Sequence, residues 1–280
     1  MFRVQLRNEL LKLFGKKRTY IGFGAFLLAQ NAMLLSFHFS HWRVRLEKIL
    51  ELNGYPIYDF ISALTVAIIM LFPQITMLMP LYACLVGGDL VAKEYEDGTL
   101  RMILSRPISR FRLILVKWCA GVIFSIILVI SLGVMALVFA RLWFPWGGLF
   151  VFIPEPEHIF SVFDSATGLK LYMVAHIFLS INAATMMTIA FMFGCFNVKP
   201  AAATILGLSF LLLNLVFENL PFMQDYRQYF LIHHLRIWIC VFGQPVNWMR
   251  IIESLIVIFT FNLTTLIIGM IGFHIRDIKS

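Results

Sequence analysis

Six long apolar stretches limit what this chain can fold into more than any other feature of its sequence. Each is at least as long as the shortest helix that crosses the hydrocarbon core of a bilayer. The predicted spans cover residues 19–39, 61–88, 111–142, 169–196, 201–217 and 251–273. A mean hydropathy of +0.86 and a charged fraction of 14% agree with a membrane protein. The sequence therefore predicts an all-α polytopic membrane protein with a single transmembrane domain over residues 1–280.

The longest charged segment between the apolar stretches covers residues 89–117. Polar residues at this density must lie in water, so the segment is a loop between the second and third spans. Within it, Gly98 can end the incoming helix, and Thr99 is a favourable N-cap for a short helix over residues 100–106. Pro107 ends that helix because it disfavours the helical conformation of the residue before it. One side of the helix carries the apolar residues Leu100, Ile103 and Leu104. Such a helix suits docking into a groove on another protein.

The residues that distinguish this loop are Glu94, Gly98-Thr99-Leu100, Ser105, Pro107, Ser109-Arg110 and Lys117. In type and order they resemble the cytoplasmic loop of ABC-2 type transporter permeases. In that family the short helix is the coupling helix, which sits in a cleft of a separate ATPase subunit. The resemblance implies a coupling-helix loop over residues 94–107. Its implied ATPase contacts are Glu94, Gly98, Thr99, Leu100, Arg101, Ile103, Leu104, Arg106 and Pro107.

Residues 1–18 predict an amphipathic helix that lies on the membrane surface. Basic residues separate apolar residues that recur at helical spacing, namely Phe2, Leu6, Leu10, Leu13 and Phe14. The segment resembles the elbow helix that precedes the first span in the same family. The alternative is the n-region of a signal peptide. The segment is too long for that, and no small-residue cleavage site follows the apolar run.

Residues 218–250 connect the last two spans. Their apolar part, Phe230–Phe242, is interrupted by His233, His234 and Arg236 and is too short to cross a bilayer. We therefore expect a re-entrant or interfacial helix on the outer side of the membrane. Members of the same family carry a similar hairpin there.

The distribution of Lys and Arg residues predicts the orientation of the chain. With the N-terminus inside, fifteen of the 23 cations lie on the inner side and eight on the outer side, as the positive-inside rule requires. Both termini are therefore expected to be cytoplasmic, and the protein is expected in the plasma membrane, which is the inner membrane in a bacterium. Because the cations gather at the ends of spans, the net charge of +8 does not require a nucleic-acid partner.

Several amide side chains are predicted to lie inside the spans. They are Gln30, Asn31, Gln74, Asn182, Asn214 and Asn262. Burying an amide in hydrocarbon is costly unless it is paired, so each should face another helix or a cavity. Hydrogen bonding between helices is one interpretation. A substrate path is the other, centred on Gln30, Asn31 and Gln74, with Asn182 and Asn214 as further candidates. Pro73 and Pro80 should kink the second span.

Nucleotide and metal chemistry have little support in the sequence. No G-x-x-x-x-G-K-[ST] phosphate-binding loop occurs, so an ATPase that powers this protein would be a separate chain. ATP and Mg²⁺ would be bound by that partner, and this chain is expected to bind no cofactor and to be no enzyme. The four cysteines form no C-x-x-C pair and are expected to be buried apolar residues. His38 and His41 have a spacing that a metal could use, but histidines at a membrane edge are more often hydrogen-bonded or solvated.

We therefore predict the membrane-spanning permease subunit of an ATP-driven ABC exporter, which binds a separate ATPase subunit and forms half of a substrate pathway. The resemblance implies a second permease chain, either identical or different, with membrane lipids around the pair. Two alternatives stay open. The first is an ABC membrane subunit that transmits a signal instead of moving a substrate. The second is an intramembrane lipid-modifying enzyme, for which His176 is the only His, Asp or Glu well inside a span.

Overall fold

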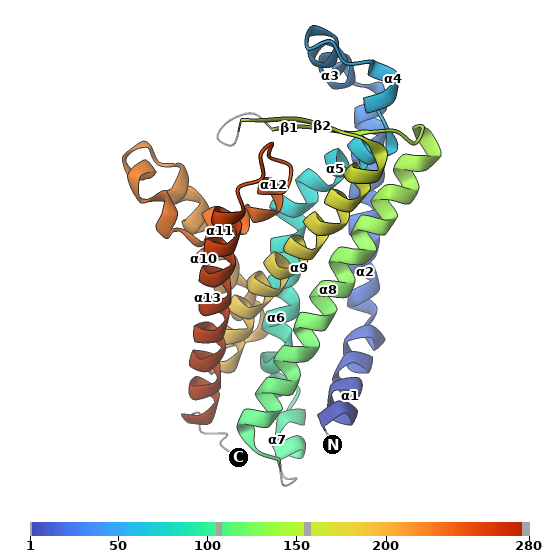
Figure 1. Cartoon of the computed structure of the whole chain (residues 1–280). Coiled ribbons are helices and arrows are strands. Elements are labelled where there is room, and N and C mark those ends of the chain that lie inside the picture. The colour runs from blue at the N-terminus through green and yellow to red at the C-terminus, as the bar shows by residue number, and fades with distance from the viewer. Residues whose placement is uncertain (1, 105–107, 154–157, 276–280) are drawn as a thin grey trace.

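The computed structural model describes residues 2–104, 108–153 and 158–275. Within the first of these ranges, residues 101, 103 and 104 are described by their backbone alone. Six helices in this part of the chain are long and apolar enough to cross a membrane. They are α2 (Lys17–Phe39), the continuous α5–α6 segment (Ala63–Glu96), α8 (Arg110–Trp143), α9 (Ser165–Cys195), α10 (Pro200–Asn219) and α13 (Trp248–Ile275). They run side by side along one axis (Figure 1). The predicted bundle of six membrane helices is confirmed.

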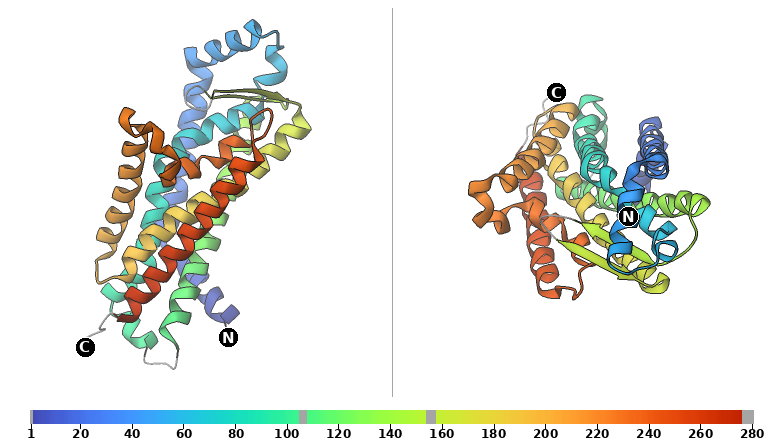
Figure 2. Two further views of the ribbon diagram at one scale, coloured as in Figure 1. Left: turned by 60° about the vertical axis from the view of Figure 1, so that its left-hand side comes forward. Right: turned by 90° about the horizontal axis from the view of Figure 1, so that it is seen from above.

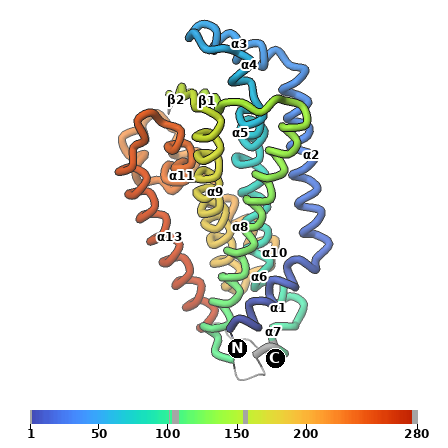
Figure 3. Tube along the Cα trace, turned by 45° about the vertical axis from the view of Figure 1, so that its right-hand side comes forward, coloured from blue at the N-terminus to red at the C-terminus, as the bar shows by residue number. Residues whose placement is uncertain are grey.

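Helix α9 lies at the centre of the bundle. Helices α6, α8, α10 and α13 pack against it, and Figure 3 shows α8 and α13 on either side of it. The approach of α6 to α9 is close, because a Cβ at Gly87 would lie 2.2 Å from the carbonyl oxygen of Met187. Small residues allow such backbone contacts between membrane helices. Seen from above, α2 lies at one edge of the bundle and the segment that follows α10 lies at the opposite edge (Figure 2).

The second span is interrupted at Pro73. It consists of α5 (Ala63–Pro73), a π-helical turn η1 (Gln74–Leu78) and α6 (Met79–Glu96). Proline has no backbone N–H and its ring clashes with the preceding turn, so regular α-helical bonding stops there. A π-helical turn continues the helix with hydrogen bonds between residues five apart. The irregularity expected from the two prolines is thus located at Pro73, whereas Pro80 lies in the first turn of α6.

The two ends of the bundle carry different short elements (Figure 1). At one end, which we call the α7 end, lie α1 (Phe2–Gly15) and α7 (Thr99–Leu104). At the other, which we call the hairpin end, lie α3 (His41–Leu52), α4 (Ile57–Phe60) and an antiparallel hairpin of β1 (Leu149–Ile153) and β2 (Ile159–Phe163).

The hairpin is an addition to the all-α prediction. The residues of β1 are apolar, aromatic or β-branched, which favours extended structure. Two hydrogen bonds hold the hairpin to the start of α5. The Phe150 N–H donates to Thr65 Oγ1 at 2.9 Å, and Ser62 Oγ donates to the Gly148 carbonyl at 2.5 Å. The hairpin is therefore fixed to the bundle at this end.

The region predicted as re-entrant or interfacial forms three short helices, namely η2 (Pro221–Tyr229), α11 (Leu231–Leu235) and α12 (Ile237–Cys240). The break between α11 and α12 falls at Arg236, which donates to the carboxylate of the fully buried Glu218 at 2.9 Å. His234 contacts Ser254 Oγ at 3.0 Å. Of the three polar residues that interrupt the apolar run in the sequence, His234 and Arg236 are therefore hydrogen-bonded within the fold, and His233 Nδ1 lies 3.7 Å from Glu218 Oε1.

Candidate functional site

Helix α7 lies between the ends of α6 and α8. Gly98 separates α6 from α7 and has a φ of 71°, a left-handed conformation that glycine adopts without strain. The Thr99 hydroxyl donates to the carbonyl of Glu94 at 3.1 Å, so it bonds back to α6 instead of capping α7. Leu100 is fully buried within the chain, whereas Met102 is 66% exposed. Helix α7 therefore packs one side onto the bundle and presents another side outward.

The structure describes part of the predicted set of ATPase contacts. Arg106 and Pro107 lie outside the described residues, and only the backbone of Arg101, Ile103 and Leu104 is described. Sequence analysis did not single out Met102, because its apolar side chain lies off the Leu100–Leu104 side of the helix. Among the α7 side chains that the structure describes, Met102 is an apolar one that points outward.

Beside α7 lies a network of four charges, Glu9, Lys12, Glu94 and Lys117, which we call the α1 network. Lys117 Nζ lies 2.9 Å from Glu9 Oε2 and 2.7 Å from Glu94 Oε2. Lys12 Nζ lies 2.8 Å from Glu9 Oε1 and 3.1 Å from Glu94 Oε1. Both ammonium groups therefore share both carboxylates, and the network joins α1, α6 and α8.

The position of Lys117 explains why the network forms. Lys117 belongs to α8, and its side chain is fully buried in the fold. A buried ammonium group is costly unless it is paired and hydrogen-bonded. Helix α1 supplies Glu9 and Lys12, which are three residues apart and so lie on one face. Sequence analysis missed Glu9. The feature that could have revealed it is that Glu9 is a single acidic residue in an otherwise basic helix.

Burial and charge pairing act in opposite directions on the pKa values of the α1 network. Burial raises the pKa of Glu9, but the charges of Lys117 and Lys12 and their hydrogen bonds outweigh it, so the pKa is lowered from 4.5. Burial lowers the pKa of Lys12, but its hydrogen bond to Glu9 and the charge of Glu94 outweigh it, so the pKa is raised from 10.5. Glu9 and Lys12 are therefore ionised at neutral pH.

Further polar contacts attach neighbouring helices at the same end. Arg18, at the start of α2, pairs with Asp89 of α6. Arg112 Nε of α8 donates to Gln5 Oε1 of α1 at 3.1 Å. Together with the α1 network, these contacts hold α1, α2, α6 and α8 together at the α7 end.

In the part of the chain that the structure describes, no three His, Cys, Asp or Glu residues form a group that could hold a metal. What the α1 network provides is a mechanical connection between helices.

The chain also matches a known protein family over most of its length. The family is described as ABC-2 family transporter protein, and the match covers residues 25–255. The chain belongs to the ABC-2 family. A relative in Bacillus subtilis (strain 168), uncharacterized protein YhcI, is 22% identical over 314 residues, with 98% of each chain covered. The resemblance carried by the loop at residues 94–117 is thereby confirmed over most of the chain.

Membership in the ABC-2 family makes this chain a multi-pass membrane protein of the type that forms the membrane part of ABC transporters. In the α1 network, Glu94 and Lys117 lie within the matched range, whereas Glu9 and Lys12 precede it. The network therefore connects the ABC-2 core of the chain to its first helix.

The lowered pKa of Glu9 makes a pH dependence testable in this ABC-2 protein. Because the folded-state pKa lies below the ordinary value of 4.5, Glu9 stabilises the fold above that pH. This contribution is lost as the pH falls through the lowered pKa. We expect Glu9→Gln to be less stable than wild type at neutral pH, and the difference to shrink below pH 4.5. Thermal unfolding of wild type and Glu9→Gln in detergent over a pH series measures this difference in stability. The exposed Glu51→Gln is the control, and a constant difference for Glu9→Gln at all pH values would contradict the assignment.

The amides predicted for a substrate path all donate to backbone carbonyls. The pairs are Gln30 with Leu132, Asn31 with Leu27, Gln74 with Met70, Asn182 with Leu235 and Asn214 with Phe210. Gln30 and Asn182 thereby connect different helices, and Asn214 connects α10 to α11 because its Oδ1 accepts from the Leu231 N–H at 3.2 Å. Asn31 and Gln74 bond within their own helical segment. These contacts fit the interpretation as hydrogen bonding that supports the bundle. A role in a substrate path stays a prediction.

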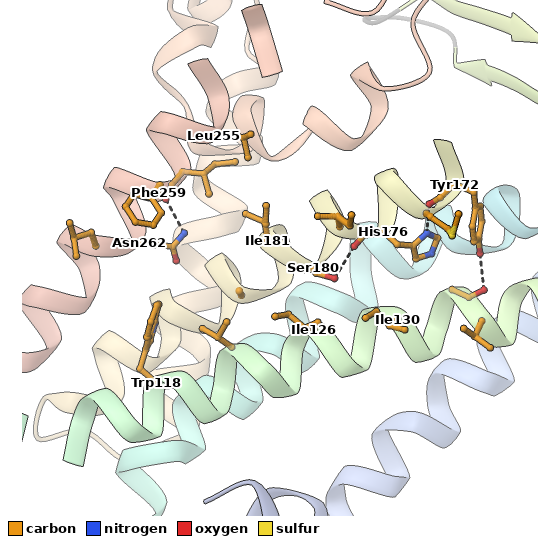
Figure 4. Close-up of a pocket in the computed structure, with 18 of the residues that line it drawn as sticks. Trp118, Ile126, Ile130, Tyr172, His176, Ser180, Ile181, Leu255, Phe259 and Asn262 are labelled. Carbon is orange, nitrogen blue, oxygen red and sulfur yellow. Dashed lines mark hydrogen bonds between the residues drawn. The ribbon is translucent and has the colours of Figure 1, made fainter. Parts of the chain in front are cut away.

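A groove of about 1130 Å³ runs along α9 between α8 and α13 (Figure 4). Two of its hydroxyl groups are used within the chain. Tyr172 donates to the Gly133 carbonyl at 2.8 Å, and Ser180 donates to the His176 carbonyl at 2.8 Å. His176 and Asn262 also line the groove, but the surface that it exposes is almost entirely apolar. Among the described residues, the five amides predicted for the substrate path do not line it.

Proposed function

We propose that this chain is the permease subunit of an ATP-driven ABC exporter, which forms half of a substrate pathway and couples to a separate ATPase subunit. The ABC-2 family supports an ABC ATPase as partner in general terms. A second permease chain, identical or different, completes the pathway, and membrane lipids surround the pair. The partner ATPase binds ATP and Mg²⁺, and this chain binds no cofactor.

The α1 network is the observation that carries the coupling part of the proposal. An ATPase that docks on α7 can move the membrane spans only if α7 is firmly connected to them. Glu94 lies just before α7 in the chain, and its carboxylate is held by Lys12 of α1 and Lys117 of α8. A displacement of α7 is then transmitted to α6, α8 and α1 together. Glu94 acts in this proposal as a positioning residue inside the permease.

The surface of α7 supplies the contacts with the ATPase. Met102 is exposed and is the apolar contact that the structure supports, and the backbone at Arg101, Ile103 and Leu104 lies on the same short helix. Arg106 and Pro107 complete the proposed contact by family resemblance. Docking of a cytoplasmic ATPase on α7 requires that the α7 end lies in the cytoplasm and that the protein lies in the plasma membrane. The excess of Lys and Arg on that side agrees with this orientation.

Transport follows by alternating access in this proposal. Closure of the ATPase dimer on ATP pushes on α7, and the connected ends of α6 and α8 reorient so that the pathway between two permease chains opens outward. Gln30, Asn31 and Gln74 stay candidates for contact with substrate on this pathway, with Asn182 and Asn214 as further candidates.

Co-purification tests the proposal. We expect an ATPase subunit with a phosphate-binding loop to co-elute with wild type from native membranes in mild detergent. Met102→Glu places a charge on the exposed apolar side chain of α7, so the amount of bound ATPase should fall at least about tenfold, equivalent to about 1.4 kcal/mol. Mass spectrometry and ATPase activity of the eluate measure both effects.

The matched control is Leu52→Glu, which places the same charge on an exposed apolar side chain at the hairpin end. It should retain the ATPase at the level of wild type. If folded wild type co-elutes with no ATPase, or if both variants retain it equally, docking on α7 is wrong.

A further inference from the structure

The groove between α8 and α13 runs along most of the membrane bundle (Figure 4). On α8 it is lined from Leu115 to Leu137, a length of about 33 Å at a rise of about 1.5 Å per residue. The hydrocarbon core of a bilayer has nearly the same thickness, about 30 Å. All three helices that form the groove are long and apolar enough to cross a membrane, so the groove faces the hydrocarbon layer.

The polar side chains along the groove direct their hydrogen bonds into the protein. Trp118 Nε1 donates to Thr188 Oγ1 at 2.9 Å, and Asn262 Nδ2 donates to Thr185 Oγ1 at 2.8 Å. The two hydroxyl groups of the groove donate to backbone carbonyls. Asn262 Oδ1 and His176 Nε2 have no partner among the described residues, but both atoms are buried. The groove therefore offers an apolar surface that suits a hydrocarbon chain, whereas a polar ligand would lose its hydrogen bonds to water there.

Helices α8 and α13 meet at the α7 end of the groove. There the Phe111 ring of α8 stacks on the His274 ring of α13, with the ring centroids 4.9 Å apart. Arg110 donates to the His274 carbonyl at 2.9 Å. Figure 3 shows the two helices drawing apart from this point toward the hairpin end. The two walls of the groove therefore join at the α7 end and are separate at the hairpin end.

Two exposed cations, Arg141 and Lys170, lie at the hairpin end of the groove. Arg141 follows Leu137 by four residues, so it lies one turn further along the same face of α8. Lys170 precedes Met173 by three residues and Ile177 by seven, and both of those residues line the groove. Within the described part of the chain neither cation pairs with a carboxylate. Both positive charges are therefore available to an anionic group.

We infer that the hairpin half of this groove binds one membrane lipid with an anionic headgroup. The headgroup lies beside Arg141 and Lys170, since long basic side chains at the ends of membrane helices reach the interface and attract anionic lipids. Half of the hydrocarbon core is about 15 Å deep, which corresponds to about ten residues of helix. The acyl tails therefore lie against Val134 and Ile130 of α8 and Ile177 of α9. The site does not depend on the proposed ATPase coupling.

A second copy of the chain fits the groove less well than a lipid does. Its spanning helices would have to supply acidic side chains to Arg141 and Lys170. At the hairpin end, the described spanning helices carry two acidic residues, namely the fully buried Glu218 and the exposed Glu253. A lipid supplies the negative charge and the hydrocarbon chains in one molecule, at the depths where the groove has its cations and its apolar wall.

Native mass spectrometry tests the headgroup contact. Wild type is reconstituted in nanodiscs of equal parts phosphatidylglycerol, which is anionic, and phosphatidylcholine, which has no net charge. The protein is then released into mild detergent, and the lipids that stay bound are counted. Arg141→Gln/Lys170→Gln should retain one phosphatidylglycerol fewer per chain than wild type, because the loss of two cations weakens binding at this site at least about tenfold.

The matched control is Arg45→Gln/Lys48→Gln, which removes two exposed cations of α3 at the same end of the bundle. It should retain as much phosphatidylglycerol as wild type. If the Arg141→Gln/Lys170→Gln variant binds as much phosphatidylglycerol as wild type, or if the control loses as much as that variant, the inference is wrong.

A second pair of variants tests the position of the tails. Ile177→Trp adds bulk to the wall of the groove at a side chain that is 60% exposed, so it should also lower the retained phosphatidylglycerol by one per chain. Ile205→Trp adds the same bulk on α10, at a side chain that is 61% exposed and lies outside the groove, and should have no effect. Equal retention by the two variants would show that the tails do not lie in the groove.

A cryo-EM map of wild type in the same nanodiscs provides a test that needs no substitution. It should show tail density between α8 and α13 beside Ile177, continuous with headgroup density near Arg141 and Lys170. A helix of a second copy in this position, or a groove without density, would overturn the inference. This map also decides if either tryptophan variant does not fold.

Discussion

Replacement of Lys117 by methionine is expected to lower the free energy of unfolding by about 3–5 kcal/mol, the usual cost of removing one partner from a buried ion pair. The Lys117 side chain is fully buried and lies within 2.9 Å of carboxylate oxygens of Glu9 and Glu94. Methionine fills a similar volume but leaves the two carboxylates facing each other with only the half-exposed Lys12 between them. Thermal and denaturant unfolding in detergent measure the loss.

The control for this prediction is Lys93→Met. Lys93 also pairs with two carboxylates, Glu96 and Asp97, but its side chain is 37% exposed, so its removal should change stability little. A double variant, Glu9→Gln/Lys117→Met, should recover part of the loss because one of the two stranded charges is gone. Equal effects of Lys117→Met and Lys93→Met would show that burial of the α1 network does not matter for stability.

Gly87→Ala is the second substitution with a large expected effect. The added Cβ would lie 2.2 Å from the carbonyl oxygen of Met187 and 3.0 Å from the backbone nitrogen of Phe191. Both contacts are with the backbone of α9, which cannot rotate away as a side chain can. Helices α6 and α9 must therefore move apart, and we expect a loss of about 1–3 kcal/mol in the free energy of unfolding, as in other overpacked sites.

Gly24→Ala is the matched control, because Gly24 also lies within a membrane helix and its added Cβ would meet no atom within 4 Å. This variant should be unchanged or slightly more stable, since alanine favours helix over glycine. Unfolding of both variants under the same conditions gives the comparison. If Gly87→Ala were as stable as Gly24→Ala, the close packing of α6 on α9 would be wrong.

The membrane bundle could be predicted from the sequence because its signal is local. The length and composition of each apolar stretch are enough to identify a span, and Gly98 and Thr99 mark where α6 ends and α7 begins. The hairpin of β1 and β2 could not be predicted in this way. Its strands are short apolar segments, and their attachment to the bundle depends on hydrogen bonds to Ser62 and Thr65, far away in the sequence.

The candidate site shows the same limit. Lys117 and Glu94 stand out in the charged loop, but Glu9 precedes Lys117 by 108 residues, and no local pattern pairs them. The exposure of Met102 and the burial of Leu100 also depend on how α7 packs onto the bundle, which the sequence of a short helix does not specify. Gln74 was identified as a buried amide, but sequence analysis could not show that it lines a small cavity together with His176, because that depends on how the second span packs against α9.

That turn also sets the helical phase of everything that follows it up to α7. Each residue of an α-helix advances the direction of its side chain by about 100°, and a π-helical turn contains about one residue more than a regular turn. The face that α6 presents to α9, including Gly87, is therefore rotated relative to the face that α5 presents. A gain or loss of one residue between Pro73 and Met79 would turn Gly87 away from Met187 and swing Glu94 away from Lys117. The number of residues in this turn, as much as their identity, determines which way α7 faces.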